Sequence, residues 1–195
     1  MSLFFYRNPC YTVFDREDMT VDIIERMKEA NRFYIAHSNE ALRRETAEHG
    51  QHPYAVVICC SDSRVIPEQI FHAGIGDLFV IRVAGNVLDR HQIGSVEYAV
   101  SHLGCKLVLM LGHTGCGAVG AALKGEADGH ISFITEDIQK AIGMERDPNK
   151  ACRLNAAHGV KILREAFLKE PNPADVEIKG AVYDIKTGAV EWLEM

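Results

Sequence analysis

Apolar positions along the chain follow two different periods. Four segments rich in apolar residues predict strands, and the first is apolar at every position, as expected of a central strand in a parallel sheet. The predicted strands are 54–59, 78–83, 106–111 and 176–185. The last of them is followed by Lys186-Thr187-Gly188 and a further apolar segment, 189–193, which together predict a terminal hairpin.

Between these segments, apolar residues recur every three or four positions, which predicts helices. The predicted helices cover residues 20–38, 40–48, 67–72, 92–103, a segment ending at 123, 131–142 and 150–169. This alternation predicts an α/β fold with a mostly parallel sheet of about four strands and helices on both faces. The terminal hairpin would add an antiparallel strand at one edge.

A chain of 195 residues is most simply one domain, 1–195, with a sizeable core. Residues 1–50 are expected to form a helical N-terminal arm that packs on a partner subunit. Residues 1–20 are too aromatic for a free tail, which indicates that they lie on another surface, either of the same chain or of a partner subunit.

Composition narrows the class of protein and its compartment. A net charge of −6 argues against a nucleic-acid-binding surface. No stretch approaches the roughly 20 apolar residues of a membrane span, and the N-terminus does not resemble a secretion signal. The six cysteines are then expected to be reduced thiols in the cytoplasm, some of them metal ligands.

Residues able to bind a metal follow two of the predicted strands. Cys60 and Asp62 come directly after the first strand, and His113 and Cys116 follow the third. If these strands are parallel neighbours, both pairs meet at the carboxyl edge of the sheet, where open α/β sheets bind ligands. Two thiols, an imidazole and a carboxylate can form a tetrahedral zinc site. Taken alone, either pair is explained equally well without a metal, by buried core cysteines and, in the second pair, a hydrogen-bonded histidine.

Arg64 favours a site with one open position. Its guanidinium can hold Asp62 off the metal, so that Cys60, His113 and Cys116 bind one Zn²⁺ per chain. Asp62 would be the fourth ligand only in a closed state. In the open state a zinc-bound water, acidified to hydroxide, would be the nucleophile, and Asp62 would orient it.

The motifs Cys60-Ser61-Asp62-Ser63-Arg64 and Gly112-His113-x-x-Cys116-Gly117 resemble those of the beta-class carbonic anhydrases. The similarity is dense from residue 51 to about 123 and looser from 155 to 193. This resemblance implies a lyase that reversibly hydrates carbon dioxide to bicarbonate and a proton. It also implies that Asp62 and Arg64 form the catalytic dyad.

The resemblance further implies a substrate pocket shared between subunits. Gln51 matches a glutamine that reaches substrate from the neighbouring subunit, and Phe79 and Tyr98 match walls of the pocket. Ala84 stands where plant-like members carry valine. The chain is therefore expected to form a homodimer or a higher assembly of dimers. His102, on the predicted helix of Tyr98, is a candidate proton relay.

One position distinguishes open from regulated members of the resembling family. Regulated members carry a tryptophan three residues before the first ligand as part of an inhibitory bicarbonate site, and this chain has Val57 there. The resemblance is therefore to the plant-like, open-site type. Cys59, beside the first ligand, is read as a small buried residue at the end of a strand, with a redox role as the alternative.

Two other functions fit the same residues. The first is hydrolysis of carbonyl sulfide or carbon disulfide, which are also linear triatomic molecules open to attack by zinc hydroxide. The second is a zinc-stabilised binding or sensing protein without turnover. Such a closed site would need neither Asp62 nor Arg64, and the presence of both favours an enzyme.

Overall fold

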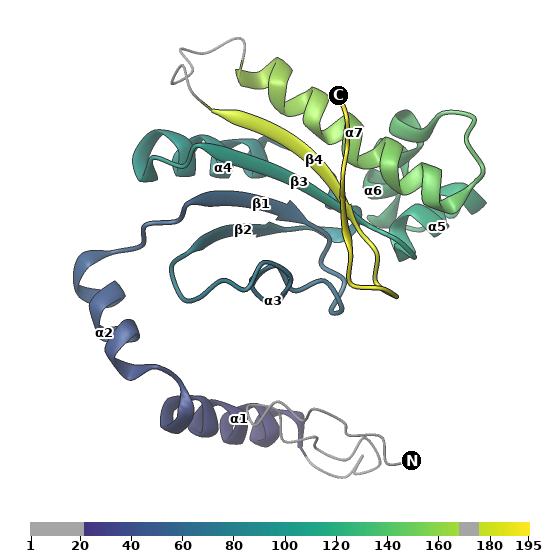
Figure 1. Ribbon diagram of the computed structural model, residues 1–195. Coiled ribbons are helices and arrows are strands. Elements are labelled where there is room, and N and C mark those ends of the chain that lie inside the picture. The colour runs from purple at the N-terminus through teal and green to yellow at the C-terminus, as the bar shows by residue number, and fades with distance from the viewer. Residues whose placement is uncertain (1–21, 168–175) are drawn as a thin grey trace, which may run out of the picture. The chain divides into compact units, whose positions relative to one another are not determined.

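The computed structural model describes residues 22–167 and 176–195 (Figure 1). The chain divides into two compact units, Met1–Glu48 and His49–Met195. The aromatic segment 1–20, expected to lie on another surface, falls outside the described residues.

In the first unit, α1 (Ile23–His37) and α2 (Glu40–His49, one residue beyond the unit) follow the two predicted helices closely. Asp22 caps α1, because its carboxylate accepts a hydrogen bond from the Ile24 backbone N–H at 3.0 Å. Several large apolar side chains of α1 are exposed: Ile23, Ile24, Met27, Tyr34 and Ile35. That the arm packs on a partner subunit stays a prediction.

The second unit contains a five-stranded sheet in the order β2-β1-β3-β4-β5. Its strands are β1 (Ala55–Cys59), β2 (Leu78–Arg82), β3 (Leu107–His113), β4 (Glu177–Tyr183) and β5 (Val190–Trp192). The first four are parallel, and β5 pairs antiparallel with β4. The predicted fold class is confirmed.

Alternate residues of the strands face two different layers. On one face, side chains such as Val56, Ile58 and Met110 pack against α4 (Arg90–Leu103) and α7 (Pro148–Phe167). On the other face, side chains of the same strands, including Val57 and Leu109, pack against the short helix α3 (Pro67–Ile70) and its flanking loop. Figure 1 shows α4 and α7 on one side of the sheet and α3 on the other.

Two helices complete the unit beside the carboxyl end of β3. These are α5 (Gly117–Lys124) and α6 (Ile131–Ile142), and both pack with α7 in a cluster of small and aliphatic side chains. Cys60 and Cys116 belong to this cluster, so the predicted ligands sit where the sheet meets three helices.

Two details differ from the sequence-based expectations. β2 was expected to be a buried strand, but it lies at the edge of the sheet and its apolar side chains are only partly buried. An apolar run alone does not reveal sheet order, so this expectation was wrong. His113 is the last residue of β3 rather than part of the loop after it, because pairing with β4 continues to the pair His113–Tyr183.

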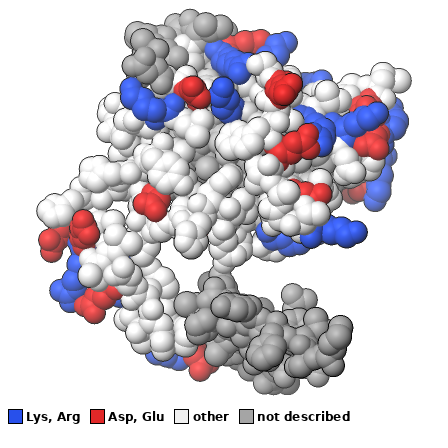
Figure 2. Space-filling model, viewed as in Figure 1, with Lys and Arg blue, Asp and Glu red and all other residues white. Residues whose placement is uncertain are grey.

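The surface carries charges of both signs. On the face drawn in Figure 2, basic and acidic side chains are interspersed around α6 and α7, while few charges lie over β1 and β2. In the described ranges 22–167 and 176–195, no helix is long and apolar enough to cross a membrane.

Candidate metal centre

Sheet register brings the two predicted ligand pairs together. β1 pairs in parallel with β3 so that Cys59 lies opposite Leu111. Both strands therefore end at the same edge of the sheet. The side chains of Cys60, His113 and Cys116 are buried, and their ligand atoms all lie within 4.8 Å of one another. In the part of the chain that is described, this is the group of His, Cys, Asp or Glu side chains close enough to hold a metal.

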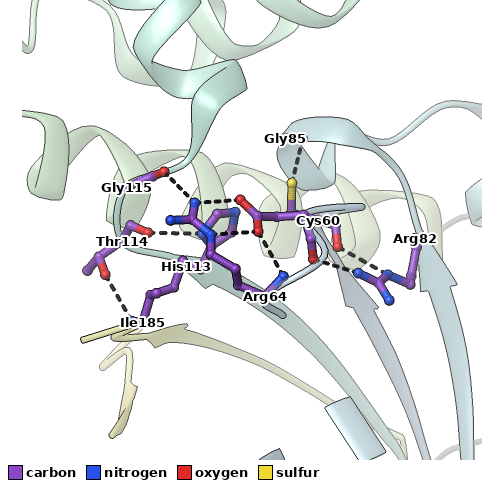
Figure 3. A network of polar contacts seen from close by, with 9 residues as sticks. Cys60, Arg64, Arg82, Gly85, His113, Thr114, Gly115 and Ile185 are labelled. Carbon is purple, nitrogen blue, oxygen red and sulfur yellow. Dashed lines mark hydrogen bonds and ion pairs between the residues drawn. The ribbon is translucent and has the colours of Figure 1, made fainter. Parts of the chain in front are cut away.

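His113 presents one ring nitrogen to this cluster. Its Nδ1 lies 3.0 Å from the Thr114 carbonyl oxygen, to which it donates a hydrogen bond in the neutral tautomer. Nε2 is buried and has no hydrogen-bond partner. A buried nitrogen without a partner is costly, and a metal ion would satisfy it. Thr114 is itself held, because its Oγ1 accepts a hydrogen bond from the Ile185 N–H (Figure 3).

Cys116 is placed by a tight turn between β3 and α5. Gly115 adopts a left-handed conformation (φ 65°), and Cys116 is the residue that precedes the first turn of α5. Backbone N–H groups of Ala118 and Val119 point at its sulfur and favour the thiolate form, as a helix N-terminus does for an anion.

The side chains of Cys60 and Cys116 interact directly, and this contact shifts the pKa of the two thiols in opposite directions. The Cys116 thiol donates a hydrogen bond to Cys60 and so lowers the pKa of Cys60 to about 4, while the pKa of Cys116 is raised by the same contact. A metal cation would take the place of that proton and favour both thiolates.

Asp62 is turned away from the metal cluster by Arg64. The Arg64 guanidinium binds both carboxylate oxygens, with Nε to Oδ1 at 2.9 Å and Nη2 to Oδ2 at 2.7 Å. The Arg64 backbone N–H adds a third hydrogen bond to Oδ1 at 3.0 Å. The side-chain bonds from Arg64 are the main reason that the pKa of Asp62 lies well below its usual range, so Asp62 is ionised.

Arg64 and Arg82 also hold the loops that carry the ligands. Arg64 Nη2 donates to the Gly115 carbonyl at 3.3 Å and so links the loop after β1 to the loop after β3. Arg82, from the end of β2, donates to the carbonyl of Asp62 at 2.7 Å and to that of Cys60 at 3.3 Å (Figure 3).

The predicted substrate-binding residues are not gathered at this site within one chain. Ala84 lies in the 3₁₀ turn η1 (Ala84–Asn86) beside Cys60, but Gln51 precedes β1 at the amino end of the sheet. Phe79 is opposite Val56, about 13 Å along the strand from the level of Cys60. The Tyr98 ring lies 6.2 Å from that of Phe79, so both belong to the far end of the sheet.

The candidate proton relay belongs to this distant group. The His102 ring lies 5.3 Å from the Tyr98 ring, on the last turn of α4, next to the amino end of β3. His102 therefore does not approach the metal cluster of its own chain.

Two contacts of the centre were not assigned from the sequence. The Gly85 N–H donates to Cys60 Sγ at 3.2 Å, and the Asn155 amide donates to the Gly85 carbonyl at 2.8 Å. The glycine at the end of Arg82-Val83-Ala84-Gly85 was a usable signal, because it marks a turn after a strand. Asn155 gives no such signal within a helix-forming segment.

An α/β sheet with a buried Cys-His-Cys cluster at its carboxyl edge defines a class of metal-binding proteins, and comparison with known proteins identifies the family. The sequence model of the carbonic anhydrase family matches residues 55–190. The chain belongs to this family, and its solved structural relatives place it in the beta class.

Two curated relatives show how far the similarity extends. A carbonic anhydrase of Mycolicibacterium smegmatis is 33% identical over 183 residues, which are 85% of this chain and 89% of that protein. Carbonic anhydrase 2 of Mycobacterium tuberculosis is 45% identical over 110 residues. That match covers 54% of this chain, and it spans only about half of the relative, 53% of its length.

Solved structures share the fold over most of their length. The beta-carbonic anhydrase CafA of Aspergillus fumigatus has a TM-score of 0.74 and 26% identity, covering 89% of this chain and 91% of its own. A tetrameric beta-carbonic anhydrase of Sordaria macrospora has a TM-score of 0.71 and 28% identity, covering 88% and 95%.

Proposed function

We propose that the chain is a zinc-dependent carbonic anhydrase that catalyses the reversible hydration of carbon dioxide to bicarbonate and a proton. The observation that carries the proposal is the buried cluster of Cys60, His113 and Cys116 beside a carboxylate, Asp62, that is held by Arg64 instead of joining the cluster. Membership of the beta class supports the same conclusion.

The donor set fits zinc. Two sulfurs and one imidazole nitrogen are ligands that Zn²⁺ binds well, and three protein ligands are typical of catalytic zinc sites. The buried Nε2 of His113 needs a partner, and the metal would provide it. Zinc held there supplies a Lewis acid that makes water nucleophilic near neutral pH.

Asp62 and Arg64 supply orientation and charge balance. The ionised carboxylate can accept a hydrogen bond from the attacking water and so direct an oxygen lone pair at carbon dioxide. Arg64 neutralises the charge of Asp62. Because it binds both carboxylate oxygens, it also fixes the position and the orientation of the carboxylate. Without Arg64, Asp62 would be free to fill the remaining ligand position.

The remaining pocket residues are proposed to come from two chains. Ala84 is beside Cys60, whereas Gln51, Phe79 and Tyr98 lie at the opposite end of the sheet and would complete the site of a neighbouring subunit. We therefore propose a homodimer or an assembly of dimers. His102, next to Tyr98, would relay protons for that neighbouring site.

The cytoplasm is the proposed compartment. All cysteines in the described residues are free thiols, which supports a reducing environment.

Zinc analysis combined with stopped-flow assay of carbon dioxide hydration tests the proposal. The wild-type protein should bind one zinc per chain and hydrate carbon dioxide rapidly, and Cys116→Ala should lose both metal and activity. Cys59→Ala is the matched control, because Cys59 is also buried but packs on the α3 side of the sheet. A zinc-loaded wild-type protein that turns over carbonyl sulfide but not carbon dioxide would contradict the proposal.

A further inference from the structure

The sulfur of Cys60 accepts a hydrogen bond from the backbone of a different loop. The Gly85 N–H lies 3.2 Å from Cys60 Sγ, and the contact is buried. A peptide N–H aimed at a thiolate withdraws charge from the sulfur and restricts its position. This matters most in a site with two thiolates, which give a metal more charge than imidazoles do.

Gly85 occupies a position that only glycine fits without strain. Its backbone is left-handed (φ 68°, ψ 11°), and a Cβ atom there would lie 2.7 Å from Ile138 Cδ1 and 3.0 Å from Ala118 Cβ. The N–H therefore reaches Cys60 only while this segment keeps a conformation that few backbones adopt.

On its α7 side the segment 85–88 is only partly packed, because Val87 and Leu88 contact the core but a cavity adjoins them. A cavity of about 70 Å³ lies there, between residues 86–88 and side chains of α6 and α7. One polar contact spans this side: Asn155 Nδ2, from the middle of α7, donates to the Gly85 carbonyl at 2.8 Å. Asn155 is only 6% exposed, so its amide bonds the segment without competition from bulk water.

We infer that Asn155 is a positioning residue of the metal centre: it fixes Gly85 so that its N–H stays on Cys60 Sγ and limits the charge that this thiolate gives to the metal. The inference rests on the proposed function, because it requires Cys60 to be a ligand. It adds a contact from α7 to a site otherwise built at the carboxyl ends of β1, β2 and β3.

Cobalt substitution provides a readout that is independent of turnover. Co²⁺ bound by thiolates absorbs through sulfur-to-cobalt charge transfer, and a more electron-rich sulfur moves that band to lower energy. Asn155→Leu, which keeps the approximate shape but has no donor, and Asn155→Ala should both show this shift. Their zinc affinity, measured by competition with a chromophoric chelator, should fall about 10–100-fold. Asn155→Gln, which keeps the amide, should lie closer to wild type.

Val160→Ala is the matched control for lost packing. Val160 is buried in α7 but belongs to the core under the sheet, away from Gly85. Its cobalt band should coincide with that of the wild type even if its stability falls. Bands at the wild-type position in both Asn155→Leu and Asn155→Ala would overturn the inference. Failure of the wild-type protein to bind zinc or cobalt would instead overturn the proposed function.

Discussion

Among individual residues, the pair Asp62 and Arg64 decides whether the proposed metal has an open position. Asp62 has its carboxylate oxygens bound by Arg64, and its backbone carbonyl is held by Arg82. The carboxylate is therefore fixed beside the cluster rather than in it. This arrangement makes the roles of the two side chains separable by mutation.

Arg64→Ala should retain zinc but lose nearly all hydration activity. The freed Asp62 would occupy the fourth position and block water, and we expect a loss of about 10²–10⁴-fold. Stopped-flow rates and zinc content measured on the same sample would test this. Arg146→Ala, at an exposed arginine between α6 and α7, is the control and should behave as wild type. Near-normal rates in Arg64→Ala with zinc in place would refute the open-site mechanism.

Asp62→Asn should also keep zinc, because three ligands remain, and should lose activity by a similar factor. The amide cannot serve as an ionised acceptor for the attacking water. Since the two residues act as a unit, the double variant should lose much less than the product of the single losses. Strictly multiplicative losses, measured as kcat/KM, would show that the two side chains act independently.

Among the elements, α4 begins at a capping residue that the spacing of apolar residues did not reveal. Its apolar pattern predicted a start at residue 92, but the helix begins at Arg90, after the N-cap Asp89. The Asp89 carboxylate accepts a hydrogen bond from the His91 N–H at 2.7 Å, and the Gln92 side chain accepts one from the Asp89 N–H at 2.9 Å. This reciprocal capping box satisfies backbone donors that would otherwise be unpaired.

Asp89→Ala should lower the free energy of unfolding by about 1 kcal/mol at neutral pH. The His91 N–H is the main reason that the pKa of Asp89 is lowered in the folded state. The stability that the ionised Asp89 carboxylate contributes is therefore fully present above its unfolded-state pKa, and it is lost as the pH falls through the folded-state pKa. The difference between the wild type and Asp89→Ala should then shrink below about pH 4.

Urea melts at pH 7 and pH 3 would measure that difference. Glu97→Ala serves as the comparison, because Glu97 is exposed on the same helix and caps nothing. An equal loss of stability for Asp89→Ala at both pH values would argue against the ionised cap.

The parts predictable from sequence were those with a local cause. Cys60 and His113 follow or end apolar strands, so the sequence placed each at a strand end, and the observed parallel pairing of β1 with β3 brings them to one edge. The position of β2 at the edge of the sheet depends on the order of the strands, which the spacing of apolar residues along the chain does not determine. The approach of Asn155 to Gly85 joins residues 70 positions apart and depends on how α7 crosses the end of the sheet.

For the whole molecule, the candidate site residues form two groups at opposite ends of the sheet. The metal cluster lies at the carboxyl end of β1 and β3, whereas Phe79 and Tyr98 lie at the amino end of β2 and on α4. A single copy of the chain therefore does not assemble every residue that the resemblance assigns to the pocket.

We expect the active protein to be a homodimer or larger in solution. The exposed apolar side chains of α1 support this expectation, since a monomer would leave them in water. Sedimentation equilibrium together with activity across a dilution series would test it. A stable monomer with full activity would contradict the shared site.

Complementation between two inactive variants tests the sharing directly. Cys60→Ala lacks a ligand and Gln51→Ala lacks the residue proposed to act across the interface. A purified heterodimer of the two has one site with its own Cys60 and its partner's Gln51, so we expect about half of the wild-type rate per dimer. If Gln51 served its own chain, the heterodimer would be no more active than the Gln51→Ala homodimer.

The separation of the two residue groups also links catalysis to abundance. If each pocket is completed by a second copy, the number of working pockets follows the equilibrium between free and associated chains, by mass action. Specific activity would then rise with protein concentration and level off above the dissociation constant of the assembly. A cell making little of this protein would hold mostly idle chains, and a modest increase in synthesis would raise hydration more than proportionally.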